Sequence, residues 1–103
     1  MDIIITGKQG EGKTSKAEAI IEGLGRVVTI TALTEEPIEV VEQLKEVGAK
    51  GVIFDEIPDL NTLNKAVQTA QLYRDQTGIN LTAVYCQQGE IINIIKNYGN
   101  NEN

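Results

Sequence analysis

A glycine-rich run near the start of the chain ends in a lysine and a threonine, in the order Gly7-Lys8-Gln9-Gly10-Glu11-Gly12-Lys13-Thr14. Glycines at this spacing let the backbone curve around a ligand, and N–H groups at a helix N-terminus attract phosphate. Lys13 has the charge to bind β- and γ-phosphate oxygens, and the Thr14 hydroxyl can ligate Mg²⁺. The run therefore predicts a site for a nucleoside triphosphate and Mg²⁺, with nucleotide contacts from Gly7, Lys8, Gln9, Gly10, Glu11, Gly12, Lys13, Thr14 and Ser15.

Two carboxylates end the apolar run 51–54 and are the next candidates for chemistry. Asp55 is the predicted second ligand of Mg²⁺, opposite Thr14, because this ion takes one or two carboxylates together with phosphate and water. Glu56 is the predicted general base, since a carboxylate beside the metal ligand can polarise a water for attack on the γ-phosphate. The alternative is that both acids only end a strand and cap the turn that follows.

Gln87 follows another apolar run and is the third candidate. Its amide could contact the γ-phosphate or orient the attacking water, which would join it to Glu56 and Lys13 in the catalytic set. A solvated loop glutamine is the alternative interpretation. The neighbouring Cys86 lies in apolar sequence, so we expect a small buried side chain rather than a reactive thiol.

Hydrophobic periodicity predicts four strands that alternate with four helices. The expected strands are residues 2–6, 26–32, 51–56 and 79–86. The expected helices are residues 13–24, a segment between Thr34 and Gly48, about 60–76, and 90–98, although 91–95 also fits a strand. Thr34 is the expected cap of the second helix, and Asp59 or Asn61 that of the third. The apolar stripes expected to face inward are Ala17, Ile20, Ile21 and Leu24; Ile38, Val41, Leu44 and Val47; and Leu60, Leu63, Val67, Ala70 and Tyr73.

This alternation predicts an α/β fold, a three-layer α/β/α sandwich with a four-stranded parallel sheet and right-handed crossovers. Residues 1–98 are expected to form one domain, followed by a polar tail at 99–103. Ligands of such sheets bind at the C-terminal ends of the strands. The glycine-rich run, the Asp55-Glu56 pair and Gln87 all fall at that edge, so their convergence strengthens the prediction of one site.

Composition excludes several other classes of protein. The chain has 103 residues, a formal net charge of −6, one cysteine and no histidine. A histidine-ligated metal site, a Ser-His-Asp triad and an internal disulfide framework are therefore excluded. The negative charge argues against a broad nucleic-acid surface. Because no basic leader or long apolar segment is seen, we expect a cytoplasmic protein with no membrane partner.

The chain resembles a P-loop NTPase of the additional-strand, catalytic-glutamate division, in a minimal single-domain form. The resemblance rests on Gly7–Thr14, on the strand Val52–Glu56 with its two terminal acids, and on Gln87 at the sensor position. It implies a strand inserted between the first and third strands, a slot that the fourth strand would fill. It also implies binding of ATP and Mg²⁺, and ATP hydrolysis. Most members of this division are ATPases such as translocases, helicases and clamp loaders.

Two departures from that pattern are informative. The usual fifth strand cannot be placed, so residues 2–6 would form an exposed apolar edge, which is a site for pairing with another chain. We therefore expect a homodimer or higher homo-oligomer joined through the first strand, or a partner protein there. The two arginines, Arg26 and Arg74, are expected to lie away from the nucleotide as surface charges, so intrinsic hydrolysis should be slow.

Three other functions compete with a weak ATPase. A small-molecule kinase would need an arginine-bearing lid, and the connections here are too short for one. A GTPase would need Asp-x-x-Gly after the third strand and Asn-Lys-x-Asp for guanine; Asp55 is followed by Glu-Ile-Pro and Asn64-Lys65 lacks the aspartate, so ATP is favoured. A nucleotide-binding regulatory or assembly protein without enzymatic activity stays open as the alternative.

Overall fold

The structure is a computed structural model that describes residues 1–7 and 11–89. Strands and helices alternate along the described chain in the order β1 (Asp2–Gly7), α1 (Lys13–Ile20), β2 (Val27–Thr31), α2 (Pro37–Val47), β3 (Gly51–Ile57), α3 (Leu60–Thr77) and β4 (Thr82–Gln88). The predicted helix at 90–98, the tail at 99–103 and the loop residues Lys8, Gln9 and Gly10 lie outside the described residues. None of the described helices is long and apolar enough to cross a bilayer.

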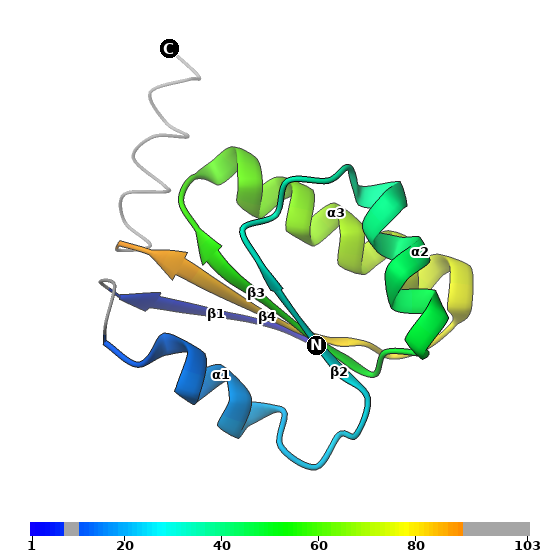
Figure 1. Ribbon diagram of the computed structural model, residues 1–103, viewed down its shortest axis with the longest axis horizontal. Coiled ribbons are helices and arrows are strands. Elements are labelled where there is room, and N and C mark those ends of the chain that lie inside the picture. Colours follow the sequence, from blue (N-terminus) through cyan, green and yellow to red (C-terminus); the bar gives the residue numbers. More distant parts are fainter. Residues whose placement is uncertain (8–10, 90–103) are drawn as a thin grey trace.

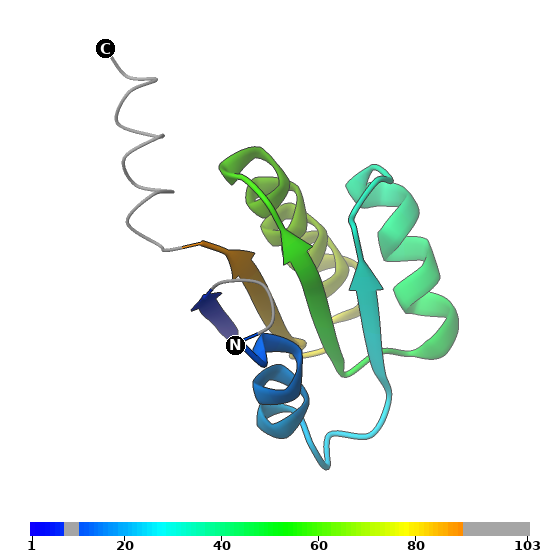
Figure 2. The same cartoon turned by 60° about the vertical axis from the view of Figure 1, so that its left-hand side comes forward.

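The four strands form one sheet in the order β1-β4-β3-β2, and every neighbouring pair is parallel. The α/β fold with a four-stranded parallel sheet is thus confirmed. The last strand, β4, lies between β1 and β3, in the slot that the resemblance implied. Figures 1 and 2 show that β1 and β2 form the two edges of this sheet, and that the strands point the same way.

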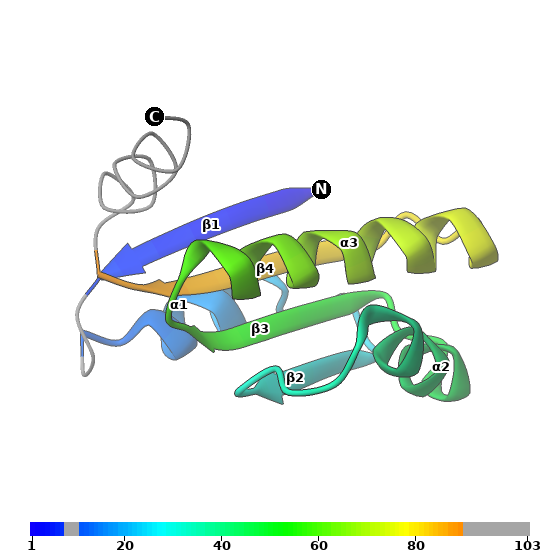
Figure 3. The ribbon, with the colours of Figure 1, turned by 90° about the horizontal axis from the view of Figure 1, so that it is seen from above.

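The helices divide between the two faces of the sheet. Helix α1 covers one face, and α2 and α3 cover the other, as Figures 1 and 3 show together. This arrangement is compatible with the predicted three-layer sandwich. The larger core lies under α2 and α3, where buried residues include Val41, Leu44, Val52, Phe54, Ala70, Tyr73 and Tyr85. The smaller core lies under α1 and contains Ala17, Ile21, Ile53, Val84 and Cys86.

Helix α1 is shorter than predicted. It ends at Ile20 rather than Leu24, and the chain then turns through Gly23 and Gly25, both of which have positive φ. The predicted apolar stripe is half wrong: Ala17 and Ile21 are buried, whereas Ile20 and Leu24 are exposed. The physical reason is that a helix of barely two turns presents only one line of contact to the sheet.

Helix α2 starts later and faces a different way than predicted. Pro37 occupies its first turn and Glu36 stands at the cap position, so the expectation of a Thr34 cap was wrong. The buried residues are Val40, Val41 and Leu44, whereas Ile38 and Val47 are 51% and 48% exposed. Helix α2 packs against α3 and shares a core with strand residues such as Val52 and Phe54. The contact with α3 selects the buried face of α2 among several apolar positions.

Helix α3 agrees with its sequence signals. Asp59 caps it by accepting the Thr62 N–H at 2.8 Å, and Gly78 ends it in the left-handed conformation. Leu63, Ala70 and Tyr73 are buried as predicted.

By contrast, β4 starts three residues later and extends two residues further than predicted, so both glutamines that follow Cys86 belong to the strand.

Candidate functional site

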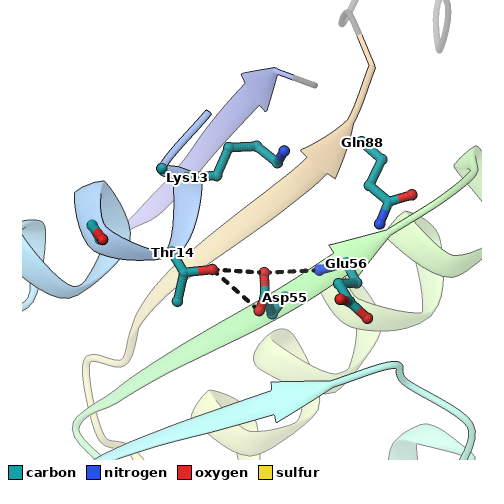
Figure 4. Close-up of a pocket in the computed structure, with 7 residues that line it drawn as sticks. Lys13, Thr14, Asp55, Glu56 and Gln88 are labelled. Atoms are coloured by element: carbon teal, nitrogen blue, oxygen red, sulfur yellow. Dashed lines mark hydrogen bonds between the residues drawn. The ribbon is translucent and has the colours of Figure 1, made fainter. Parts of the chain in front are cut away.

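An open pocket of about 320 Å³ lies at the C-terminal edge of the sheet, where the predicted site residues were expected to converge (Figure 4). Its walls come from the start of α1 and from the ends of β3 and β4. The lining residues are Gly12, Lys13, Thr14, Ser15, Asp55, Glu56 and Gln88. Most of the predicted site residues within the described chain are therefore brought together. Gly7 and Glu11 are not in the lining, and Lys8, Gln9 and Gly10 are outside the described residues.

The N-terminus of α1 forms one wall of this pocket. Gly12 precedes the helix with φ +79°, in the left-handed region that a side chain would disfavour, and its carbonyl accepts the first helical bond, from the Lys16 N–H at 3.1 Å. No side chain caps the helix. The first N–H groups of a helix have no carbonyl partner within it and carry partial positive charge. This wall therefore suits an anion.

Lys13 is buried, with 8% of its surface exposed, and its ammonium group donates to the Gly7 carbonyl at 3.0 Å. A buried ammonium group is stable only where hydrogen bonds compensate its lost hydration. The Gly7 backbone is itself held by Gly89, with N···O distances of 3.0 and 2.9 Å in the two directions. The end of β4 thus supports the carbonyl to which Lys13 binds.

Thr14 and Asp55 lie next to each other in the pocket lining, although they are 41 residues apart in the chain. The Thr14 hydroxyl lies 3.2 Å from each carboxylate oxygen of Asp55 and donates to them (Figure 4). The Glu56 N–H also donates to Asp55 Oδ1, at 3.0 Å. The two predicted metal ligands therefore form a pair of adjacent oxygen donors, and the Glu56 carboxylate lies exposed beside them.

Gln88, rather than Gln87, lines the pocket. Gln87 is only 3% exposed; its Nε2 donates to the Gln88 carbonyl at 2.9 Å, and its Oε1 has no hydrogen-bond partner among the described residues. Successive strand residues point to opposite faces, and Cys86 belongs to the core under α1, so Gln88 shares the α1 face with the pocket. Because β4 is apolar on both faces, its sequence does not alternate between apolar and polar residues. The sequence therefore did not show that Gln88, rather than Gln87, faces the pocket.

Cys86 is buried beneath the start of α1, with its sulfur 4.0 Å from the Lys13 carbonyl. Burial, aided by the negative charge of Asp55, raises the pKa of its thiol to about 11, against a smaller opposing effect of Lys13. The thiol is therefore protonated at neutral pH and is a poor nucleophile. This agrees with the predicted buried role for Cys86.

Neither arginine lines the pocket. Arg74 bonds at the opposite end of the sheet to Asp2, with Nη2 2.9 Å from Oδ1, and to the Leu81 carbonyl at 2.7 Å. Burial alone would raise the pKa of Asp2, but the hydrogen bonds from Arg74 and Tyr85 and the positive charges of Arg74 and the N-terminus together hold this pKa below its usual range. Arg26 lies at the start of β2, where its carbonyl accepts the Lys50 N–H at 2.8 Å. The expectation that both arginines lie away from the site is met.

Comparison of the chain with protein-family models, with curated proteins and with solved structures finds no match in any of the three.

Proposed function

We propose that this chain is a P-loop NTPase of the additional-strand, catalytic-glutamate division that binds ATP with Mg²⁺ and hydrolyses it slowly. One arrangement carries the proposal: the N-terminus of α1 with Lys13, the Thr14–Asp55 pair and Glu56 all line one pocket. The position of β4 between β1 and β3 is a second, independent point of agreement with that division. The three-layer P-loop fold is part of the same proposal.

The polyphosphate would be bound by the start of α1 and by Lys13. Lys13 already lies in the pocket wall with its ammonium group on the Gly7 carbonyl. A phosphate oxygen is a stronger acceptor than a carbonyl because the bond joins two charges. Lys13 would therefore exchange its bond to Gly7 for bonds to phosphate, and the N–H groups of the first turn would bind the remaining oxygens.

Thr14 and Asp55 have the donor atoms that magnesium prefers, since this hard cation binds hydroxyl and carboxylate oxygens. The described residues contain no group of three or more His, Cys, Asp or Glu side chains that could hold a metal by themselves. A two-residue set fits an ion that takes its other ligands from phosphate and water. When bound, Mg²⁺ neutralises charge on the phosphate oxygens.

Glu56 is the proposed general base. Its carboxylate is exposed at the pocket, beside the Asp55 carboxylate that would face the metal. From there it would accept a proton from the water that attacks the γ-phosphate. Gln88 takes over the role predicted for Gln87, because Gln88 is the glutamine on the pocket wall and can orient that water through its amide.

Slow turnover follows from the positions of the arginines. Within the described residues, Arg74 is bound to Asp2 and Arg26 lies at the start of β2, so neither is available to stabilise charge in the transition state. An arginine in that position accelerates related phosphoryl transfers by about 10³–10⁵-fold. The same observation favours the alternative, a nucleotide-binding regulatory or assembly protein without turnover.

Binding and turnover of ATP with Mg²⁺ test the proposal directly. Lys13→Ala should weaken ATP binding by about 10–100-fold in calorimetry, because it removes the charge-assisted bonds to phosphate. Lys50→Ala is the matched control, since it removes the same charge at the far end of the sheet and should bind normally. Equal affinity in both variants would refute the phosphate site.

Glu56→Gln separates the enzyme from the alternative. The substitution keeps the shape of the side chain and removes the base, so binding should persist while phosphate release falls by about 10²–10⁴-fold. A wild-type protein that binds ATP with no release of phosphate, at any protein concentration, would favour the non-enzymatic role. Loss of binding in Glu56→Gln would contradict the assignment of this residue.

Self-association through β1 belongs to the same proposal. Strand β1 pairs only with β4 in the described sheet, so its outer edge carries unpaired backbone groups. Ile4 is 44% exposed on this strand, whereas Ile3 and Ile5 pack on the core under α1. A second copy of the chain pairing along this edge would bury Ile4 and complete the sheet.

A further inference from the structure

Strand β3 contains one extra residue where it reaches the pocket. Phe54 and Ile57 are three residues apart, yet they pair with residues of β4 that are only two apart. Asp55 and Glu56 therefore lie opposite a single residue of β4. Two residues opposite one define a β-bulge, a feature that redirects side chains and is common beside functional sites.

The bulge changes which face of the sheet each side chain meets. In a regular strand, residues three apart point to opposite faces. Here Phe54 and Ile57 both lie in the core under α2 and α3. The residues between them, Asp55 and Glu56, both line the pocket, although neighbours in a regular strand would diverge. The extra residue thus brings two consecutive carboxylates to one site.

This geometry has a conformational cost at Glu56. Its φ is +53°, in the left-handed region, and Glu56 is not a glycine. Side chains other than glycine disfavour this region, and such conformations persist where surrounding contacts enforce them. One such contact is present: Asp55 Oδ1 accepts the Glu56 N–H at 3.0 Å. Asp55 therefore supports the backbone of the residue that follows it.

We propose that the bulge at Asp55–Glu56 is a strained positioning element that directs the Glu56 carboxylate into the pocket, and that Asp55 is the positioning residue for the Glu56 backbone. The role of the bulge in catalysis rests on the proposed function, whereas the backbone strain at Glu56 does not depend on it. Asp55 then has two roles, since one carboxylate faces Thr14 and also holds the amide of its neighbour.

Thermal unfolding of two variants without nucleotide tests the strain. Glu56→Gly should melt about 3–8 °C above Glu56→Ala, because glycine relieves the left-handed penalty by more than it adds to the entropy of the unfolded chain. In an extended backbone the order would be reversed. A melting temperature for Glu56→Gly at or below that of Glu56→Ala would overturn the proposal.

Ala32 provides a matched control for this comparison. It also has positive φ, at 57°, and it lies just beyond β2, outside the lining of the pocket. Ala32→Gly should raise the melting temperature by a similar amount and leave phosphate release unchanged. Glu56→Gly should instead lose phosphate release, since it removes the carboxylate. An Ala32→Gly variant that melts higher and keeps its phosphate release would show that relief of a left-handed residue does not by itself abolish activity.

Amide hydrogen exchange tests the role of Asp55. Asp55→Asn keeps an oxygen acceptor for the residue 56 amide, whereas Asp55→Ala removes it. The amide of residue 56 should therefore exchange about 5–10-fold faster in Asp55→Ala than in Asp55→Asn. Equal exchange rates would remove Asp55 from the support of the bulge. If the wild-type chain hydrolyses no nucleotide, the proposed function fails, while the melting and exchange results still decide the conformational proposal.

Discussion

Thr14→Val tests the pair of side chains on which the proposed metal site depends. Valine keeps the branched shape of threonine and removes only the hydroxyl that lies 3.2 Å from both oxygens of Asp55. A hydrogen bond to a charged group is worth about 1.5–3 kcal/mol, and we expect less than that range here because both residues are only half-buried. We expect a loss of about 1 kcal/mol in the free energy of unfolding, or about 4–8 °C in Tm.

Thr14→Val should also weaken binding of ATP in the presence of Mg²⁺. The expected loss of affinity is at least about 10-fold, since replacement even of residues one shell away from a metal costs about 10–100-fold. Binding measured with EDTA should change much less, because the phosphate contacts of Lys13 are retained. Thr14→Ser, which restores the hydroxyl, is the control and should behave like the wild type in both assays.

A double-mutant cycle with Asp55→Ala, which removes both acceptor oxygens, separates the pair from its surroundings. If Thr14 and Asp55 interact directly, their effects on stability are not additive, and the coupling energy should be about 1 kcal/mol. Urea denaturation of the two single variants and the double variant measures it. Additive effects, together with unchanged magnesium-dependent affinity in Thr14→Val, would refute the pair as the metal-facing element of the site.

Three further predictions concern the cap of α3, the edge of the sheet and the pocket glutamine. Backbone and side-chain hydrogen bonding to Thr62 lowers the pKa of Asp59, so its stabilising effect is complete above about pH 4 and is lost as the pH falls through the lowered pKa. Asp59→Ala should cost about 1 kcal/mol in urea denaturation at pH 7, a difference that shrinks in acid; a pH-independent loss would contradict this. Ile4→Lys should convert an oligomer into a monomer in sedimentation, whereas a wild-type monomer with an unprotected β1 edge would exclude edge pairing. Gln88→Ala should reduce phosphate release more than Gln87→Ala at equal ATP affinity. A larger loss in Gln87→Ala would instead support the catalytic role that the sequence predicts for Gln87.

Much of the fold follows from local sequence signals. Apolar runs and their spacing identified the four described strands and three described helices, because burial on both faces of a parallel sheet leaves a long apolar run for each strand. Gly48 and Gly78 end α2 and α3 in the left-handed conformation, which glycine adopts without a steric penalty because it has no Cβ. Asp59 was one of two predicted caps and is the residue that bonds to the helix.

The buried faces of the helices could not be predicted in the same way. Helix α2 has apolar residues on more than one side, so its periodicity allowed two orientations. Its packing against α3 decides between them, and that contact joins segments that are separate in the chain. The predicted stripe through Ile38 and Val47 therefore failed, while Val41 and Leu44, which both orientations share, are buried.

The candidate site was also predicted only in part from the sequence. The residue types and their order in the sequence were sufficient to nominate Lys13, Thr14, Asp55 and Glu56, because each has a chemical role that depends on local spacing. Only the tertiary structure decided how they meet. The bulge in β3 exists only relative to its partner β4, and the choice of Gln88 over Gln87 depends on which face of β4 meets α1. Strand pairing sets both, and a single sequence does not record the register between strands.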